Sequence, residues 1–228
     1  MKIKTLVIAA ATLAVGAITS QAQVYSQNIV GYVNQAFPPS KYVLVTTPMD
    51  TGNNVITNII QGVPGGSLLQ IWSGGGFTSY QYKGTPKHWI NLLDNTTNDN
   101  YVLSPGVGYF LESGGVVGFT NTYSGQIVVN SGSAATNALT TGLQPVGSKV
   151  PFSDVITNGA TVNLQVGGGT TIQIWNVGSQ NYTSYQWKNA QHSFQNLSTL
   201  VYTNPVINVG QGFFISPNVA TNWIQTSP

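Results

Sequence analysis

The chain has 228 residues, no Cys and no Arg, and charged residues make up only 5% of it. The lack of Cys excludes a disulfide framework, a thiolate nucleophile and a Cys-ligated metal, and the lack of a basic stripe argues against nucleic acid or an anionic membrane surface as a partner. Aromatic residues at 11% nevertheless supply a core, and the length suits two domains of roughly 100 residues.

The N-terminus has the pattern of a secretory signal peptide. Lys2 and Lys4 precede an apolar run over residues 5–18, and a small-x-small cleavage pattern (TSQA) follows over 19–22. A transmembrane anchor is the alternative, but the run is shorter than the roughly 20 residues that a span needs. We therefore expect a signal peptide over 1–22, no membrane span after cleavage, and a protein that is secreted, at the cell surface or periplasmic. Cleavage would leave five Lys (7 − 2) against five acidic residues, a net charge near zero.

The first half of the mature chain alternates β-branched and aromatic runs with Gly, Pro and Asn turns, which is typical of antiparallel strands. Residues 55–60 could form either a helical turn or a strand, because their β-branched side chains suit both. No window has a sustained helical period, so we expect few or no helices. The expected strands cover 25–34, 42–47, 65–72, 77–83, 105–111 and 116–122.

The same plan restarts at Tyr123. The run 65–72 (GGSLLQIW) recurs as 168–175 (GGTTIQIW), and 77–83 (FTSYQYK) recurs as 182–188 (YTSYQWK). The offsets drift from 98 (127 − 29) to 105 (183 − 78), as small loop insertions in a tandem duplication would produce. The sequence therefore predicts an all-β protein of two tandem, duplicated antiparallel β-sandwich-like modules, residues 23–122 and 123–228.

The duplicated hairpin has two different faces if Trp72 lies opposite Phe77 and Trp175 lies opposite Tyr182. Side chains alternate along a strand, so Ile71 and Tyr80 would then share a core face. The Trp pairs would share a wetter face with Gln and Ser. Such a pair is either a ligand platform that stacks on sugar rings or a cross-strand clamp, and the clamp is favoured because single exposed apolar residues need no function. Trp72, Phe77, Trp175 and Tyr182 are the candidate glycan-binding residues.

No reactive constellation stands out, so we expect no catalytic residues, no metal site and no cofactor. Asp50 and Asp154 precede the same Val-Ile-Thr-Asn run in each module, where turn or helix capping explains them better than glycosidase chemistry. His88 and His192 recur after the hairpin and are interpreted as turn residues. The glycines of 106–108 (GVG) and 210–212 (GQG) have the wrong spacing for a nucleotide loop and are interpreted as strand-entry turns.

The order of a Q-I-W hairpin, a T-S-Y-Q strand and a G-x-G-[YF]-F strand resembles duplicated β modules in secreted bacterial proteins of unknown function. The resemblance covers nearly all of the mature chain, although the second module has Val209 where the first has Pro105. It implies bacterial export and a β fold, and it carries no catalytic or binding residues.

These observations favour a non-catalytic exported protein with a structural or adhesive role at the cell surface or in the extracellular matrix. Self-association or cell-surface polysaccharide are the partners expected, since a net charge near zero removes repulsion between molecules. The alternative is a carbohydrate-binding module with one weak aromatic site per repeat. An enzyme is the least favoured class.

Overall fold

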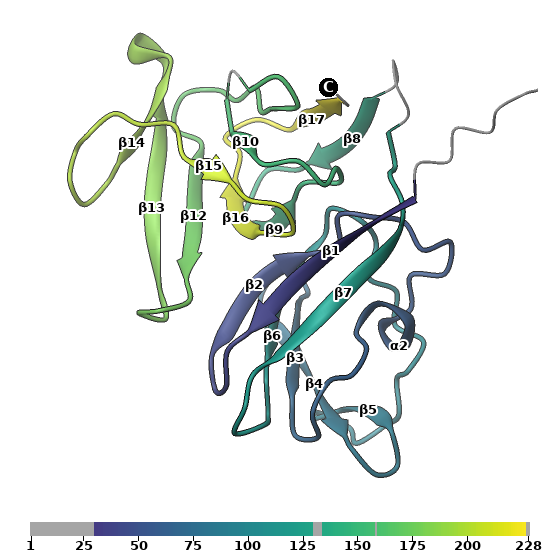
Figure 1. Cartoon of the computed structure of the whole chain (residues 1–228). Coiled ribbons are helices and arrows are strands. Elements are labelled where there is room, and N and C mark those ends of the chain that lie inside the picture. The colour runs from purple at the N-terminus through teal and green to yellow at the C-terminus, as the bar shows by residue number, and fades with distance from the viewer. Residues whose placement is uncertain (1–29, 130–133, 158, 227–228) are drawn as a thin grey trace, which may run out of the picture.

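The computed structural model describes residues 30–129, 134–157 and 159–226 (Figure 1). The expected signal peptide lies outside them. Within the described ranges the structure is almost entirely antiparallel β-sheet, which confirms the predicted fold class. The only helical segments there are the four-residue α2 (Ile56–Ile59) and a 3₁₀ turn over Asn189–Gln191. None of the helices in this part of the chain is long and apolar enough to cross a membrane.

The chain forms two lobes, an N-terminal lobe over residues 30–126 and a C-terminal lobe from 127 onward (Figure 1). The N-terminal lobe has one five-stranded sheet in the order β2-β6-β3-β4-β5 and a two-stranded ribbon, β1-β7. Its strands are β1 (Val30–Phe37), β2 (Tyr42–Thr46), β3 (Leu68–Trp72), β4 (Phe77–Lys83), β5 (His88–Asn91), β6 (Gly108–Glu112) and β7 (Phe119–Gln126).

The C-terminal lobe has the matching strand order in its own five-stranded sheet, β9-β16-β12-β13-β14. In place of the ribbon it has the sheet β11-β17-β8, and β10 pairs with β15. Its strands are β8 (Ala134–Leu139), β9 (Gln144–Gly147), β10 (Asp154–Val155), β11 (Val162–Asn163), β12 (Thr171–Asn176), β13 (Asn181–Lys188), β14 (Ser193–Asn196), β15 (Val206–Ile207), β16 (Gly212–Ser216) and β17 (Thr221–Thr226).

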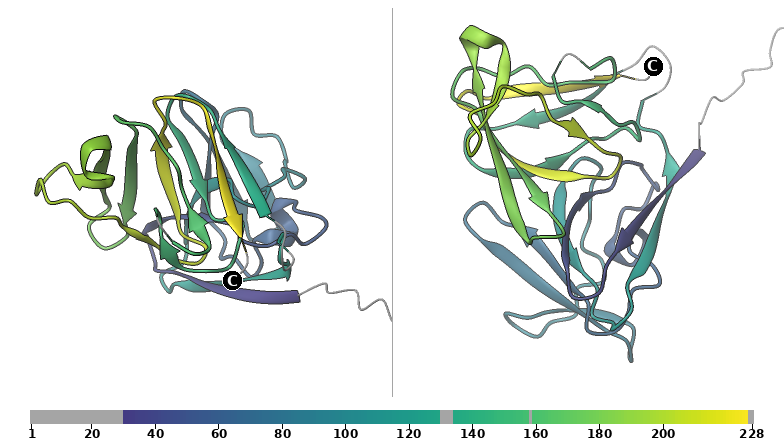
Figure 2. Two further views of the ribbon diagram at one scale, coloured as in Figure 1. Left: turned by 90° about the horizontal axis from the view of Figure 1, so that it is seen from above. Right: turned by 60° about the vertical axis from the view of Figure 1, so that its left-hand side comes forward.

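Each lobe is a two-layer structure with its own core. In the N-terminal lobe Leu69 and Leu111 of the five-stranded sheet share one buried cluster with Phe37 and Tyr123 of the ribbon and with Ile56 of α2. The C-terminal lobe repeats this arrangement, with a second cluster between its five-stranded sheet and β8, β11 and β17. Figure 2 shows the ribbon β1-β7 on the outside of the N-terminal lobe.

The strand β7 runs through the module boundary expected between residues 122 and 123. Tyr123 is 1% exposed and belongs to the N-terminal core, whereas Ile127 packs against the C-terminal core. The chain therefore passes from the N-terminal core to the C-terminal core after Gln126. The run from Tyr123 to Gln126 looks like the start of a module in sequence because it repeats a motif, but its alternation completes the ribbon with β1.

The run that suited both a helical turn and a strand begins with a strand-like pairing in each lobe, since Val55 makes a β-bridge and Val155 lies in β10. The N-terminal run then forms α2, whereas Ile156 and Thr157 form a turn. The hairpin registers are as predicted, because Trp72 lies opposite Phe77 and Trp175 lies opposite Tyr182.

Candidate functional site: an aromatic junction between the lobes

The core face of each hairpin is the predicted one. Leu69, Ile71 and Tyr80 are buried at 0%, 4% and 4% exposure. The other face is wetter, since Phe77 is 40% exposed and Tyr182 is 38% exposed. That face is not open to solvent along its whole length, because the two lobes meet there.

The four candidate residues converge on this junction. Trp72 contacts Phe77 across its own hairpin at 5.1 Å between ring centroids, and Trp175 contacts Tyr182 at 4.8 Å, both edge to face. These are the cross-strand clamps considered from the sequence. Each Trp also packs on a Phe of the other lobe: Trp72 lies 5.6 Å from Phe214, and Trp175 lies 5.1 Å from Phe110. The residues therefore form one shared cluster rather than two separate platforms.

Hydrogen bonds cross the junction in matching pairs. The indole Nε1–H of Trp72 donates to the carbonyl of Leu143 at 3.1 Å, and that of Trp175 donates to the carbonyl of Tyr42 at 2.8 Å. Leu143 and Tyr42 lie at corresponding places, beside β9 and at the start of β2. Contacts that are made twice with the partners exchanged are the mark of a two-fold interface. The two lobes of the chain are thus related by an approximate two-fold axis, like the two subunits of a symmetric dimer.

The backbone shows the same reciprocity. The N–H of Thr46 donates to the carbonyl of Gly210 at 2.9 Å, and the N–H of Gly147 donates to the carbonyl of Gly106 at 2.9 Å. Gly106 and Gly210 have φ of +84° and +71°, so they are the turns that the sequence predicted. Each of these strand-entry turns also packs against the edge strand of the other lobe.

The second glycine of each G-x-G run has a role that the sequence did not reveal. A Cβ on Gly108 would lie 2.9 Å from the carbonyl carbon of Pro145, and a Cβ on Gly212 would lie 2.9 Å from the carbonyl oxygen of Val45. Both neighbours are backbone atoms of the other lobe. Glycine at these positions permits the close approach of the two sheets.

A groove of about 280 Å³ opens at one end of this junction. Aromatic rings from both lobes make its walls, and one amide adds a hydrogen-bonding group. Its lining residues are Tyr42, Gln70, Phe77, Phe110, Trp175 and Tyr182. Three of the four candidate residues therefore line the groove, and the fourth, Trp72, supports it from behind through Phe77. Tyr42 and Phe110 were missed by sequence reasoning because only the meeting of the lobes brings them there.

The groove carries no charged side chain in its lining. Burial, together with the charge of Glu112, raises the pKa of Tyr42 to about 12, and burial also raises the pKa of Tyr182. Both phenols are therefore neutral well above physiological pH. The walls offer flat apolar rings, phenol hydroxyls and an amide, which are suited to an uncharged ligand with both apolar faces and hydroxyl groups.

The hairpin loops make the junction unequal at its two ends. In the C-terminal lobe the side chain of Gln180 accepts a hydrogen bond from the N–H of Tyr42 at 3.0 Å and donates one to its carbonyl at 3.1 Å. The N-terminal hairpin has a Ser-Gly-Gly-Gly loop over 73–76, which lacks such a side chain. The groove lies at the end where Tyr42 is held.

His88 meets a carboxylate, but the contact is structural. Its Nδ1 lies 2.5 Å from Oδ2 of Asp99, whose Oδ1 accepts from the N–H of Trp89 at 2.8 Å. The C-terminal lobe has the same arrangement with other residues: Asn204 accepts from the hydroxyl of Ser193 at 3.2 Å and from the N–H of Phe194 at 3.0 Å.

The structural counterpart of His88 is thus Ser193, and the match to His192 suggested by the sequence is displaced by one residue. His88 and Asp99 do not line the neighbouring cavity, whose wall includes Lys87 and Trp89. A pair that Ser and Asn replace in the other lobe anchors a loop to a strand and needs no acid–base chemistry.

Asp50 and Asp154 organise turns, as expected. Asp50 accepts from the N–H of Gly52 at 2.8 Å, and Asp154 accepts from the N–H of Thr161 at 2.9 Å. The hydrogen bonds that Asp154 accepts lower the pKa of its carboxyl group, and the one from the backbone N–H of Thr161 contributes most. Within the described ranges no group of three or more His, Asp or Glu side chains is placed to hold a metal ion.

Comparison with protein-family models, curated proteins and solved structures gives no match to this chain.

Proposed function

We propose that the protein is a non-catalytic, exported adhesive protein that holds a neutral polysaccharide in the groove between its lobes. The groove carries this proposal, because it joins aromatic walls from both lobes with no charged group in the lining. Export rests on the signal-peptide pattern of residues 1–22. An exported protein of this kind would act at the cell surface or in the extracellular matrix. The resemblance to exported bacterial β modules is further support.

The shared groove changes the carbohydrate hypothesis in one respect. One aromatic site per repeat would give two equivalent sites, whereas here Phe77 from one lobe and Tyr182 from the other face the same space. We therefore propose one polysaccharide site per chain at these residues. A rigid junction also limits the ordering that binding requires, since both walls are held in place by packing.

Affinity electrophoresis tests the proposal in gels that contain a soluble neutral polysaccharide such as hydroxyethylcellulose, xylan or galactomannan. We expect retardation by at least one of them, and a several-fold weaker retardation for Phe77→Ala and Tyr182→Ala. Tyr32→Ala is the matched control, because Tyr32 is 72% exposed and lies on the ribbon, away from the groove. Absence of retardation in every gel, or an equal loss in the control, would contradict the proposal.

A structural role through self-association is the second candidate, and exposed apolar loops support it. The loops that join β6 to β7 and β16 to β17 expose Val116, Val117 and Val219 at 96%, 74% and 67%. With a net charge near zero after signal cleavage, little repulsion opposes contact between copies. Light scattering over a range of protein concentrations should show association that Val116→Ser and Val117→Ser reduce; a monomer throughout would exclude this role.

A further inference from the structure

Each lobe has a second cavity, on the opposite face of its hairpin from the groove. The two cavities occupy corresponding places: Thr57 and Tyr82 line the one in the N-terminal lobe, and Thr157 and Trp187 line the one in the C-terminal lobe. Tyr82 and Trp187 correspond because each lies opposite an aromatic residue of the next strand, Trp89 or Phe194. The volumes are about 290 and 300 Å³.

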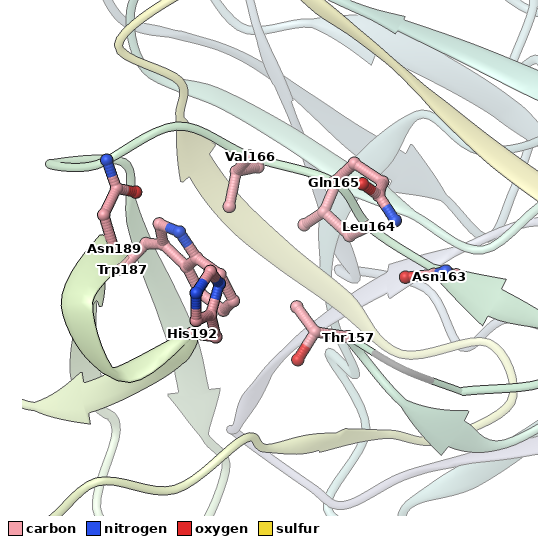
Figure 3. Close-up of a pocket in the computed structure, with 8 residues that line it drawn as sticks. All are labelled: Thr157, Asn163, Leu164, Gln165, Val166, Trp187, Asn189 and His192. Atoms are coloured by element: carbon pink, nitrogen blue, oxygen red, sulfur yellow. The ribbon is translucent and has the colours of Figure 1, made fainter.

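The C-terminal cavity has an aromatic wall and a polar rim. Figure 3 shows Trp187, Asn189 and His192 on one side and Thr157 and residues 163–165 on the other. Gln165, Asn189 and His192 are exposed, whereas Thr157 and Leu164 are buried. The amides and the imidazole therefore lie at the mouth, and the floor is formed by Thr157 and Leu164.

The side chain of Thr157 lies against this space. Thr157 is 2% exposed, and its side chain projects across the cavity toward His192 in Figure 3. Within the described ranges its Oγ1 has no hydrogen-bond partner. Trp89, which lines the N-terminal cavity, is 0% exposed and likewise has an unpartnered Nε1. Buried polar groups in proteins are nearly always paired, so these two groups mark a place beside each cavity where the packing leaves a polar atom unsatisfied.

We propose that the C-terminal cavity binds a single neutral sugar unit, either free or at the end of a glycan chain. The indole of Trp187 offers a flat apolar face, and the amides of Gln165 and Asn189 can donate to and accept from hydroxyl groups. The lining has no carboxylate and no Lys, so it does not select a charged ligand. The volume sets the ligand at the size of one ring, at the lower end of small-molecule pockets.

The N-terminal cavity is an internal comparison. Lys87 and Gly62 are part of its wall, and Gln61 is its one amide side chain. It offers fewer neutral hydrogen-bonding groups around its aromatic wall, so we place the sugar site in the C-terminal lobe alone. The proposal rests on this lining and is independent of the groove between the lobes.

The five Trp residues of the chain allow the two sites to be read separately in one NMR experiment. Indole N–H signals of the mature protein are followed while D-glucose, D-galactose, D-xylose or N-acetyl-D-glucosamine is added, and matching disaccharides then distinguish a free sugar from a chain end. We expect at least one sugar to shift the Trp187 signal with a dissociation constant in the millimolar range. Trp175 reports the groove, because it lines that space.

Gln165→Ala and Asn189→Ala should each weaken this titration several-fold without unfolding the protein, since both side chains are exposed. Lys87→Ala in the N-terminal cavity is the matched control and should leave it unchanged. The proposal is overturned if no sugar shifts the Trp187 signal, or if the shift survives both amide substitutions. A shift of Trp175 without one of Trp187 would support the groove and refute this second site.

Discussion

Single glycines set how closely the two lobes approach each other. Gly108 and Gly212 lie where the sheet of one lobe meets backbone atoms of the other. The sequence shows these glycines as a repeated pair but cannot show their purpose, because the neighbouring atoms belong to strands more than thirty residues away along the chain, Pro145 and Val45. From one sequence, a glycine that a turn requires cannot be distinguished from a glycine that close backbone packing requires.

Gly108→Ala and Gly212→Ala should each destabilise the protein, because the new methyl group would meet backbone atoms at 2.9 Å that have no side-chain freedom. We expect a loss of about 1–3 kcal/mol in the free energy of unfolding, the usual cost of overpacking. Urea denaturation measures it. Gly75→Ala is the control, since its Cβ would have no neighbour within 4 Å; an equal effect there would contradict the close-approach role.

Asp99 provides a test of the structural role given to its contact with His88. If the carboxylate only anchors the loop, Asp99→Asn should keep most of the stability, because Asn204 performs the same task in the other lobe. Asp99→Ala should cost about 1–3 kcal/mol by leaving the N–H of Trp89 without its acceptor. Thermal unfolding of the two variants compares them, and equal losses would contradict the anchoring role.

Tyr109 predicts an alkaline limit to stability. It is fully buried with its hydroxyl 3.0 Å from that of Tyr123, and burial raises the pKa of Tyr109 to about 12 from 10.0. The folded state then holds its proton more tightly than the unfolded state, so this stability is fully present below pH 10 and falls between about pH 10 and 12. A shift of this size corresponds to about 3 kcal/mol. Urea denaturation at several pH values should show that fall, and Tyr109→Phe should reduce it without abolishing it, because burial also raises the pKa of Tyr123; an unchanged slope in the variant would assign the loss to other groups.

The hairpin is the element that the sequence predicted best. The assumed pairing of Trp72 with Phe77 is confirmed, and alternation from that pair placed Ile71 and Tyr80 in the core, because alternation is a property of a single strand. What covers the other face could not be predicted in this way. That depends on the twist of both sheets and on the docking of β2 and β9, which no local pattern encodes. The face with the Trp pair was therefore expected to be the wetter one, and it is one wall of a junction between the lobes.

Both indole hydrogen bonds should stabilise the junction, since they are counterparts. Trp72→Phe and Trp175→Phe each keep an aromatic ring and remove the N–H that reaches the other lobe. We expect each to lower the free energy of unfolding by about 1–2 kcal/mol from the lost hydrogen bond and the smaller ring. Equilibrium denaturation in urea provides the measurement. A loss at only one of the two positions would contradict the reciprocal arrangement.

At the scale of the whole molecule, the junction makes two similar lobes into one body. Duplication was visible in sequence, and it predicted the matching strand orders that both sheets have. The relation between the copies was not visible, and neither was the groove, because its walls come from residues as distant as Tyr42 and Tyr182. The function that we propose is therefore based on the pair of hairpins and not on each hairpin separately.

A double-mutant cycle between Phe110 and Trp175 tests this central claim most directly. The two rings belong to different lobes and lie 5.1 Å apart, edge to face. Phe110→Ala, Trp175→Ala and the double variant are compared with the parent by urea denaturation. A shared cluster predicts a coupling energy of about 0.5–1.5 kcal/mol between the two positions. Additive losses, with no coupling beyond error, would contradict the claim that the aromatic residues of the two lobes form one site.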